Sequence, residues 1–241
     1  MTFCTHLLNG EHIRQASSAL LHNKKDILDS YGLAMFASEL STLPWGISNS
    51  VYMPYDTLSK ANGGDEPCEP YQFRMTRASM AATLVHGTMQ CVWRNHFGIF
   101  DKVIRAYDRF GVQQARFVGY WHEPAKVANA ADVYVSCYVR EGRVLAVVSH
   151  LGKSHVDQTP EIAFDWKALG MARAPTKAVD VLTAPDPDYE TLFARRRQFK
   201  VPVSRAPLAL GDFGTKVEAF DGTRLRLHLP YHTFALVLLE P

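Results

Sequence analysis

Apolar residues recur at helical spacing in the first half of the chain. Between residues 99 and 110 the apolar positions fall three or four apart, as expected when one side of a helix packs against a core. These positions are Ile99, Phe100, Val103, Ile104, Tyr107 and Phe110. Gly111 follows, and glycine commonly ends a helix in the left-handed conformation. The pattern predicts a helix over 99–110, and weaker patterns predict helices over 26–40 and 76–82.

Short apolar runs separate the predicted helices. Residues 50–55 and 84–92 have the composition of strands. Because these runs alternate with helices, parallel pairing through helical crossovers is favoured. The first half therefore predicts an α/β arrangement of a few βα units.

After Trp121 the apolar spacing changes to two. Between residues 133 and 139, valine or cysteine alternates with tyrosine or serine, as in a strand with two different faces. Glu141-Gly142 and Asp221-Gly222 are turn signals between such runs. Further strands are predicted over 143–149, 216–220, 223–229 and 233–239. Regular short strands of this kind indicate an antiparallel β-sandwich, and the change of spacing predicts two domains, residues 1–120 and 121–241.

Two interpretations of the first half remain open. A (β/α)₈ barrel needs roughly 200–250 residues, and an incomplete parallel sheet leaves an open edge. The segment is either a small, unusual α/β domain or the C-terminal part of a longer fold. We favour the second.

Several segments resemble the C-terminal end of glycoside hydrolases in which a TIM barrel carries an appended β-sandwich. They are LLNGEH at 7–12, PWG at 44–46, TLVHGT at 83–88, RFVGYW at 116–121, VLAVVSHLG at 144–152, FDWKALGM at 164–171, AVDV at 178–181 and HLPYHTFAL at 228–236. In these segments the sequence resembles the glycoside hydrolase family 123-like proteins.

This resemblance implies a fold class and a place for catalysis. The fold is expected to be α/β plus all-β, with the last βα units of a (β/α)₈ barrel followed by an antiparallel β-sandwich. In the family, an adjacent Asp-Glu pair in the barrel is catalytic and the acetamido group of the substrate is the nucleophile. Asp65-Glu66 lies in a Gly- and Pro-rich loop instead. The family's pair is therefore expected upstream of Met1 or absent, and the chain by itself is expected to be incomplete and inactive.

Glu11 is the candidate catalytic residue. With Asn9 and His12, it follows a short apolar run, as a loop after a barrel strand would, and such loops build the active site of that fold. Glycoside cleavage usually needs two carboxyl groups, of which Glu11 would supply one. The alternative is a solvent-exposed loop carboxylate or a helix cap.

Aromatic and histidine side chains are candidates for binding sugar. Trp45 and Trp93 offer flat apolar faces, although each could equally fill a core. Tyr52 and His86 could hydrogen-bond sugar hydroxyls, and for His86 the alternative is a buried ring held by a backbone carbonyl.

Composition excludes several other classes of function. Twenty-six Lys and Arg against 24 Asp and Glu leave a net charge of +2, so no strong field attracts nucleic acid. No apolar run is long enough for a membrane span, and the first residues lack a secretion signal, which leaves the compartment open. His6, His12 and His22 have no metal-ligand spacing, and no phosphate-binding loop or nucleophile elbow is present. No metal or cofactor is predicted, and the oligomeric state stays open.

Two functions compete. The first is the C-terminal part of a carbohydrate-active hydrolase with a carbohydrate substrate. The second is a non-catalytic carbohydrate-binding or scaffold module.

Overall fold

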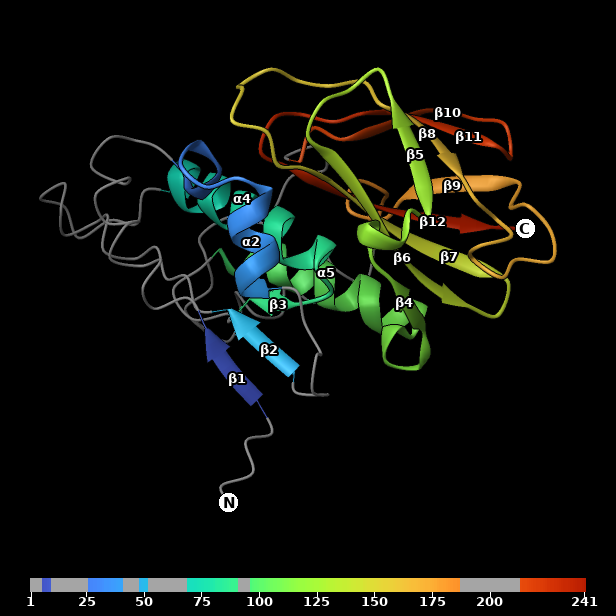
Figure 1. The fold of residues 1–241 in the computed structure, drawn as a ribbon, viewed down its shortest axis with the longest axis horizontal. Helices are drawn as coiled ribbons and strands as arrows, with labels where there is room; N and C mark the ends of the chain where they lie inside the picture. The colour runs from blue at the N-terminus through green and yellow to red at the C-terminus, as the bar shows by residue number, and fades with distance from the viewer. Residues whose placement is uncertain (1–5, 10–25, 41–47, 52–68, 91–95, 187–212) are drawn as a thin grey trace, which may run out of the picture.

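The computed structural model describes residues 6–9, 26–40, 48–51, 69–90, 96–186 and 213–241. Within these ranges the fold is mostly antiparallel β-sheet with few helices. Figure 1 shows the helices between a small parallel sheet and two larger antiparallel sheets.

The parallel sheet and the helices alternate along the first part of the chain. Strand β1 (His6–Asn9) pairs with β2 (Ser48–Val51), which pairs with β3 (Met89–Gln90), and both pairings are parallel. The helices that follow these strands are, in chain order, η1 (Ile27–Asp29), α2 (Leu33–Leu40), α4 (Glu69–Val85) and α5 (Phe97–Phe110). This part is α/β, as the alternating pattern predicted.

Two antiparallel sheets make up the rest. The five-stranded sheet has the order β4 (Arg116–Val118), β6 (Val133–Arg140), β7 (Arg143–His150), β12 (Phe234–Glu240) and β9 (Lys177–Asp180). The four-stranded sheet has the order β10 (Lys216–Phe220), β11 (Arg224–His228), β8 (Glu161–Phe164) and β5 (Ala125–Ala128). Short 3₁₀ turns, η2 (Val112–Gln114) and η3 (Tyr120–His122), flank β4. The predicted β-rich half is confirmed.

The five-stranded sheet is buried on both faces. Along β7, Val144, Ala146 and Val148 point into a core shared with the four-stranded sheet. Leu145 and Val147 point into a second core shared with α4 and α5. Burial on both faces explains why β7 and β12 consist of nearly unbroken apolar runs.

Helix α5 confirms the helix predicted over 99–110, but one position of the predicted buried stripe differs. Gly111 ends the helix with φ 78°, and its N–H lies near the carbonyls of Tyr107 and Asp108. Ile104, assigned to the buried stripe, is 40% exposed. The stripe along α5 is narrower than the sequence suggested.

Other predicted bounds are wrong. The helix expected over 26–40 is broken, because Asp26 and Asp29 form a capping box around the 3₁₀ turn η1 and α2 begins only at Leu33. The helix expected over 76–82 runs from Glu69 to Val85, so the strand expected over 84–92 is helical at its start. The resemblance also implies a strand over 164–171, but β8 ends at Phe164 and turns follow.

Strand β4 bears on the boundary expected at residue 121. It pairs with β6 and therefore belongs to the five-stranded sheet, although it precedes Trp121. The division into 1–120 and 121–241 stays a prediction.

Candidate functional site

Most of the sequence-predicted site residues lie outside the described ranges. This applies to Glu11, His12, Trp45, Tyr52 and Trp93. Asn9 is the last residue of β1, where it pairs with Val51 of β2. Their roles stay predictions, and His86 is the one candidate whose side chain the structure describes.

His86 lies in the turn after α4 and is completely buried. Its Nδ1 is 2.5 Å from the carbonyl oxygen of Ala82, and its Nε2 is 3.2 Å from the Tyr120 hydroxyl. A ring that donates from Nδ1 and accepts at Nε2 is neutral. Burial lowers the pKa of His86 in keeping with this, although the Ala82 hydrogen bond opposes the shift. The contacts match the alternative of a buried ring held by a backbone carbonyl.

Two buried histidines, His86 and His150, predict a loss of stability in mild acid. Burial also lowers the pKa of His150, and the nearby His232 lowers it further. The unfolded chain takes up protons near the ordinary value of 6.5, whereas the folded chain binds them only at lower pH. Stability should therefore be complete above that value and decline as the pH falls below it. Urea unfolding between about pH 7.5 and 5.5 measures this slope.

His86→Gln should reduce the slope, because the variant has no group to titrate at that position. His122→Gln is the matched control, since His122 is exposed. A slope that is unchanged by His86→Gln would show that His86 does not contribute to it.

A cluster of charged side chains joins the helical part to the turn between β11 and β12. We call it the junction cluster; its members are Asp26, Asp29, Arg74, His155 and His232. The Asp26 carboxylate accepts from the backbone N–H of Leu28 at 3.0 Å, and the Asp29 carboxylate accepts from the Asp26 N–H at 2.7 Å. Arg74 of α4 donates to both carboxylates, at 3.0 and 3.3 Å. One cation thus holds two acids that cap η1.

His232 adds the connection to the β-rich part. It is completely buried and lies 2.8 Å from an Asp26 oxygen through Nδ1 and 2.9 Å from the Gly152 carbonyl oxygen through Nε2. Burial by itself would raise the pKa of Asp26, but the hydrogen bonds and charges of His232 and Arg74 outweigh it and lower that pKa. The buried carboxylate is therefore ionised and depends on its two partners.

The junction cluster also contains a possible metal-ligand set. Donor atoms of Asp29, His155 and His232 all lie within 4.8 Å of one another. His155 contacts Asp29 and stacks on the Tyr231 ring at 4.9 Å between centroids. Both nitrogens of His232 already face acceptors, so a metal ion would have to displace Asp26 or Gly152 from the ring. As it stands, the cluster satisfies its own charges and links distant segments.

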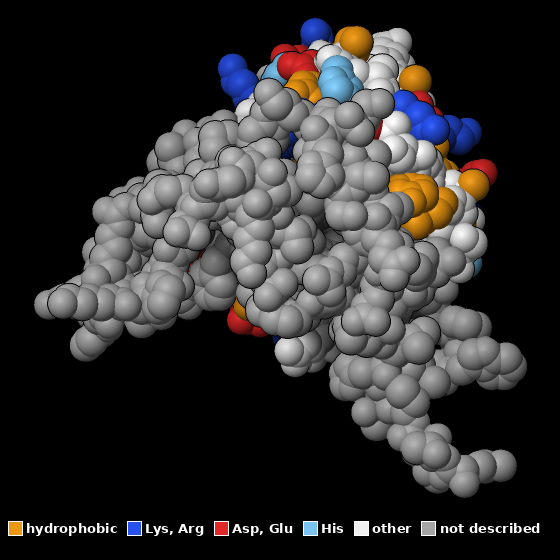
Figure 2. All heavy atoms as spheres, turned by 90° about the vertical axis from the view of Figure 1, so that its left-hand side faces the viewer, with side chains coloured by type: hydrophobic (Ala, Val, Ile, Leu, Met, Phe, Trp, Pro, Cys, Tyr) orange, Lys and Arg blue, Asp and Glu red, His pale blue; other side chains and the backbone are white. Residues whose placement is uncertain are grey.

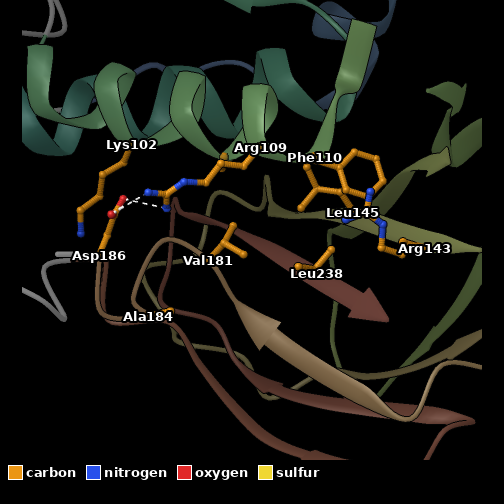
Figure 3. Close-up of a pocket in the computed structure, with 10 residues that line it drawn as sticks. Lys102, Arg109, Phe110, Arg143, Leu145, Val181, Ala184, Asp186 and Leu238 are labelled. Carbon is orange, nitrogen blue, oxygen red and sulfur yellow. Dashed lines mark hydrogen bonds and ion pairs between the residues drawn. The ribbon is translucent and has the colours of Figure 1, made fainter. Parts of the chain in front are cut away.

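A cavity of about 230 Å³ lies between α5 and the five-stranded sheet. Figure 3 shows Lys102, Arg109 and Phe110 extending from the helix toward Asp186, Val181 and Leu238. Two Arg109 nitrogens lie 2.8 and 3.0 Å from the Asp186 oxygens, and Lys102 donates to the Leu182 carbonyl at 2.9 Å. Drug-sized ligands usually occupy roughly 300–1,000 Å³, so this cavity fits only a small group. Lys102 and Arg109 already bind oxygens of the chain itself. These contacts hold the helix against the sheet, and we assign no ligand to the cavity.

Neither the junction cluster nor the cavity beside α5 could be predicted from the sequence. Asp26 and His232 are 206 residues apart, and Arg109 and Asp186 are 77 apart, so no local spacing connects them.

On the face shown in Figure 2, the described side chains include acidic, basic and histidine groups side by side. That mixture agrees with the net charge of +2.

Comparison with known proteins relates part of the chain to a family. Residues 101–208, from α5 into the β-rich part, match the family model described as Glycoside hydrolase 123, C-terminal domain. The chain therefore contains a glycoside hydrolase 123-like C-terminal part, as the resemblance implied. No curated protein and no solved structure matches the chain. Among the described residues, no helix is long and apolar enough to cross a membrane.

Proposed function

We propose that the chain is the C-terminal part of a carbohydrate-active glycoside hydrolase. In this proposal it contributes the last βα units of a (β/α)₈ barrel and a supporting β-sandwich. The observation that carries the proposal is the match of residues 101–208 to the C-terminal domain of glycoside hydrolase 123. The matched segment begins in α5, which follows three parallel strands with helices between them.

The order of strands and candidate residues supports the barrel interpretation. In such barrels the loops after the strands form the active site. Glu11 comes two residues after the end of β1, Tyr52 comes directly after β2, and Trp93 follows β3 by three residues. All three follow strands of the same parallel sheet, and in that fold the carboxyl ends of the strands meet on one face.

Glu11 alone is insufficient for glycoside cleavage. Retaining and inverting mechanisms each need two placed carboxyl groups, and the family's adjacent acidic pair has no counterpart in a barrel-strand context here. The second carboxyl group, in this proposal, belongs to the other barrel strands. The 241-residue chain should then show no useful turnover.

A panel of aryl glycosides tests this expectation. The purified chain should release no aryl alcohol above the buffer rate. A chain extended by the codons upstream of Met1, roughly 200 for a complete barrel, should release it, and Glu11→Gln should slow the extended enzyme. Turnover by the 241-residue chain that Glu11→Gln abolishes would contradict the need for other strands. Failure of the extended chain on every glycoside would contradict the hydrolase itself.

The second candidate is a non-catalytic carbohydrate-binding module. One observation favours it: Trp121, inside the matched segment, is an exposed aromatic residue in the described part of the chain. The candidates differ in outcome, because a binding module would retain sugar without cleaving it in any length of chain.

A further inference from the structure

Trp121 lies in the short turn η3 and keeps 42% of its surface exposed. Two other large apolar residues among those described are similarly exposed, Ile104 and Val156, and both are aliphatic. A tryptophan that only filled a core would be buried, so the exposed indole requires another explanation.

The indole ring is held in one orientation. It meets the Tyr120 ring edge-on at 5.1 Å and the Phe117 ring at 6.0 Å between centroids. It also lies against Gly119, where an added Cβ would be only 2.4 Å from the ring. Residue 119 has φ −70°, which any residue can adopt, so glycine there leaves room for the indole.

The turn beneath the ring is itself fixed. The Tyr120 backbone N–H donates to the Ser136 hydroxyl at 2.9 Å, and the Tyr120 hydroxyl meets His86 at 3.2 Å. A ring that is already ordered loses little conformational freedom when it binds a ligand.

One polar ring lies beside the exposed indole. The His122 ring is 5.9 Å from the Trp121 ring at a tilt of 54°, and His122 is exposed. Along the chain, the exposed Glu123 follows directly, and the exposed Lys126 comes three residues after it. A protein partner usually covers about 800 Å² on each side, far more than one indole offers. The flat apolar spot with hydrogen-bonding neighbours instead fits one sugar ring.

We propose that Trp121 and His122 form a binding platform for a single pyranose unit of a glycan. The electron-rich indole face attracts the C–H groups of the sugar ring, and the His122 nitrogens bond its hydroxyls. This proposal rests on the proposed carbohydrate-related function and adds a site to it. The proposed site needs no catalytic carboxyl group.

Nitrogen-15 NMR of the whole chain tests the platform. The chain has four tryptophans, whose indole N–H signals can be assigned by substitution. Titration with methyl β-glucopyranoside, methyl β-galactopyranoside and their 2-acetamido analogues up to about 50 mM covers millimolar affinities. With at least one of these sugars, the Trp121 signal should shift more than the other indole signals.

Four substitutions refine the test. Trp121→Ala should weaken binding about fivefold or more, whereas Trp121→Phe should retain part of it. Gly119→Ala should weaken binding by pushing the indole aside, with a melting temperature within about 2 °C of the parent. Trp166→Phe is the matched control, because the Trp166 indole N–H donates to the Gly222 carbonyl within the β-rich part. That variant should bind like the parent.

No shift at Trp121 with any of these sugars would overturn the platform, as would equal weakening by Trp121→Ala and Trp166→Phe. These outcomes are separate from those of the hydrolysis assay. Hydrolysis by the extended chain without a Trp121 shift would reject the platform alone. A Trp121 shift without hydrolysis would reject the hydrolase and leave the platform in place.

Discussion

Replacing Asp26 by asparagine should lower the free energy of unfolding by about 3–5 kcal/mol, the usual cost of removing one partner from a buried ion pair. Asp26 and His232 are both completely buried, and Arg74 donates to the same carboxylate. Without the carboxylate, Arg74 loses one of its two counter-charges and the buried His232 ring loses the charged partner of its Nδ1. Urea unfolding at pH 7 measures the change.

Glu218→Gln is the matched control. Glu218 pairs with Arg226 at 2.9 Å on the surface, where the Glu218 side chain is 34% exposed and the Arg226 side chain is 57% exposed. Exposed pairs contribute between 0 and about 1 kcal/mol, so the control should unfold almost like the parent. If both variants lost the same free energy of unfolding, burial of the Asp26 pair would add nothing to its contribution to stability.

The Asp26 pKa adds a second signature. Because that pKa is lowered on folding, the stabilisation by Asp26 is present above its ordinary value of 3.8 and is lost as the pH falls through the lower folded value. Asp26→Asn should therefore flatten the loss of stability at the acid end of the pH range.

Replacing Phe234 by alanine should cost about 3–5 kcal/mol, as expected for a large cavity in a core. Phe234 begins β12, is completely buried and meets the Phe213 ring at 5.5 Å. It belongs to the core that the five-stranded sheet shares with α4 and α5. The cavity would therefore weaken the contact between the sheet and the helices.

Far-ultraviolet and near-ultraviolet circular dichroism should follow one shared transition in the Phe234→Ala variant, at a lower temperature than in the parent. Val156→Ala, at a residue that is 60% exposed, should change the midpoint little. If the helical signal melted at the parent's temperature while the β signal shifted, the shared core would not couple the two parts.

Two helices illustrate how far local patterns reach. Helix α5 was predicted within two residues because it is buried on one side and polar on the other, which produces the three-and-four spacing. Helix α4 was predicted too short because its residues from Met75 to Val85 are almost all buried. A helix that is covered on all sides shows no contrast between faces, so its ends leave little signal.

Strands show the same limit. The runs that became β7 and β12 were recognised from their apolar residues and from the turns beside them. Which face of each strand meets the helices depends on where α4 and α5 pack. The residue pattern within a strand carries no information about that packing. The short strand β4 was missed as part of the sheet, because its three residues pair with β6 only once both are folded.

The sequence by itself determined the class of each half, the hairpin at Asp221-Gly222 and the likeness to a glycoside hydrolase 123 C-terminal part. Turn residues and side-chain periodicity act over a few positions, so these features can be predicted from short stretches of sequence. The tertiary structure alone decided the rest. It brought Asp26 to His232 across 206 residues, placed His86 under Tyr120, and left Trp121 partly exposed. Contacts of this kind depend on how layers pack, and packing joins residues without regard to their distance along the chain.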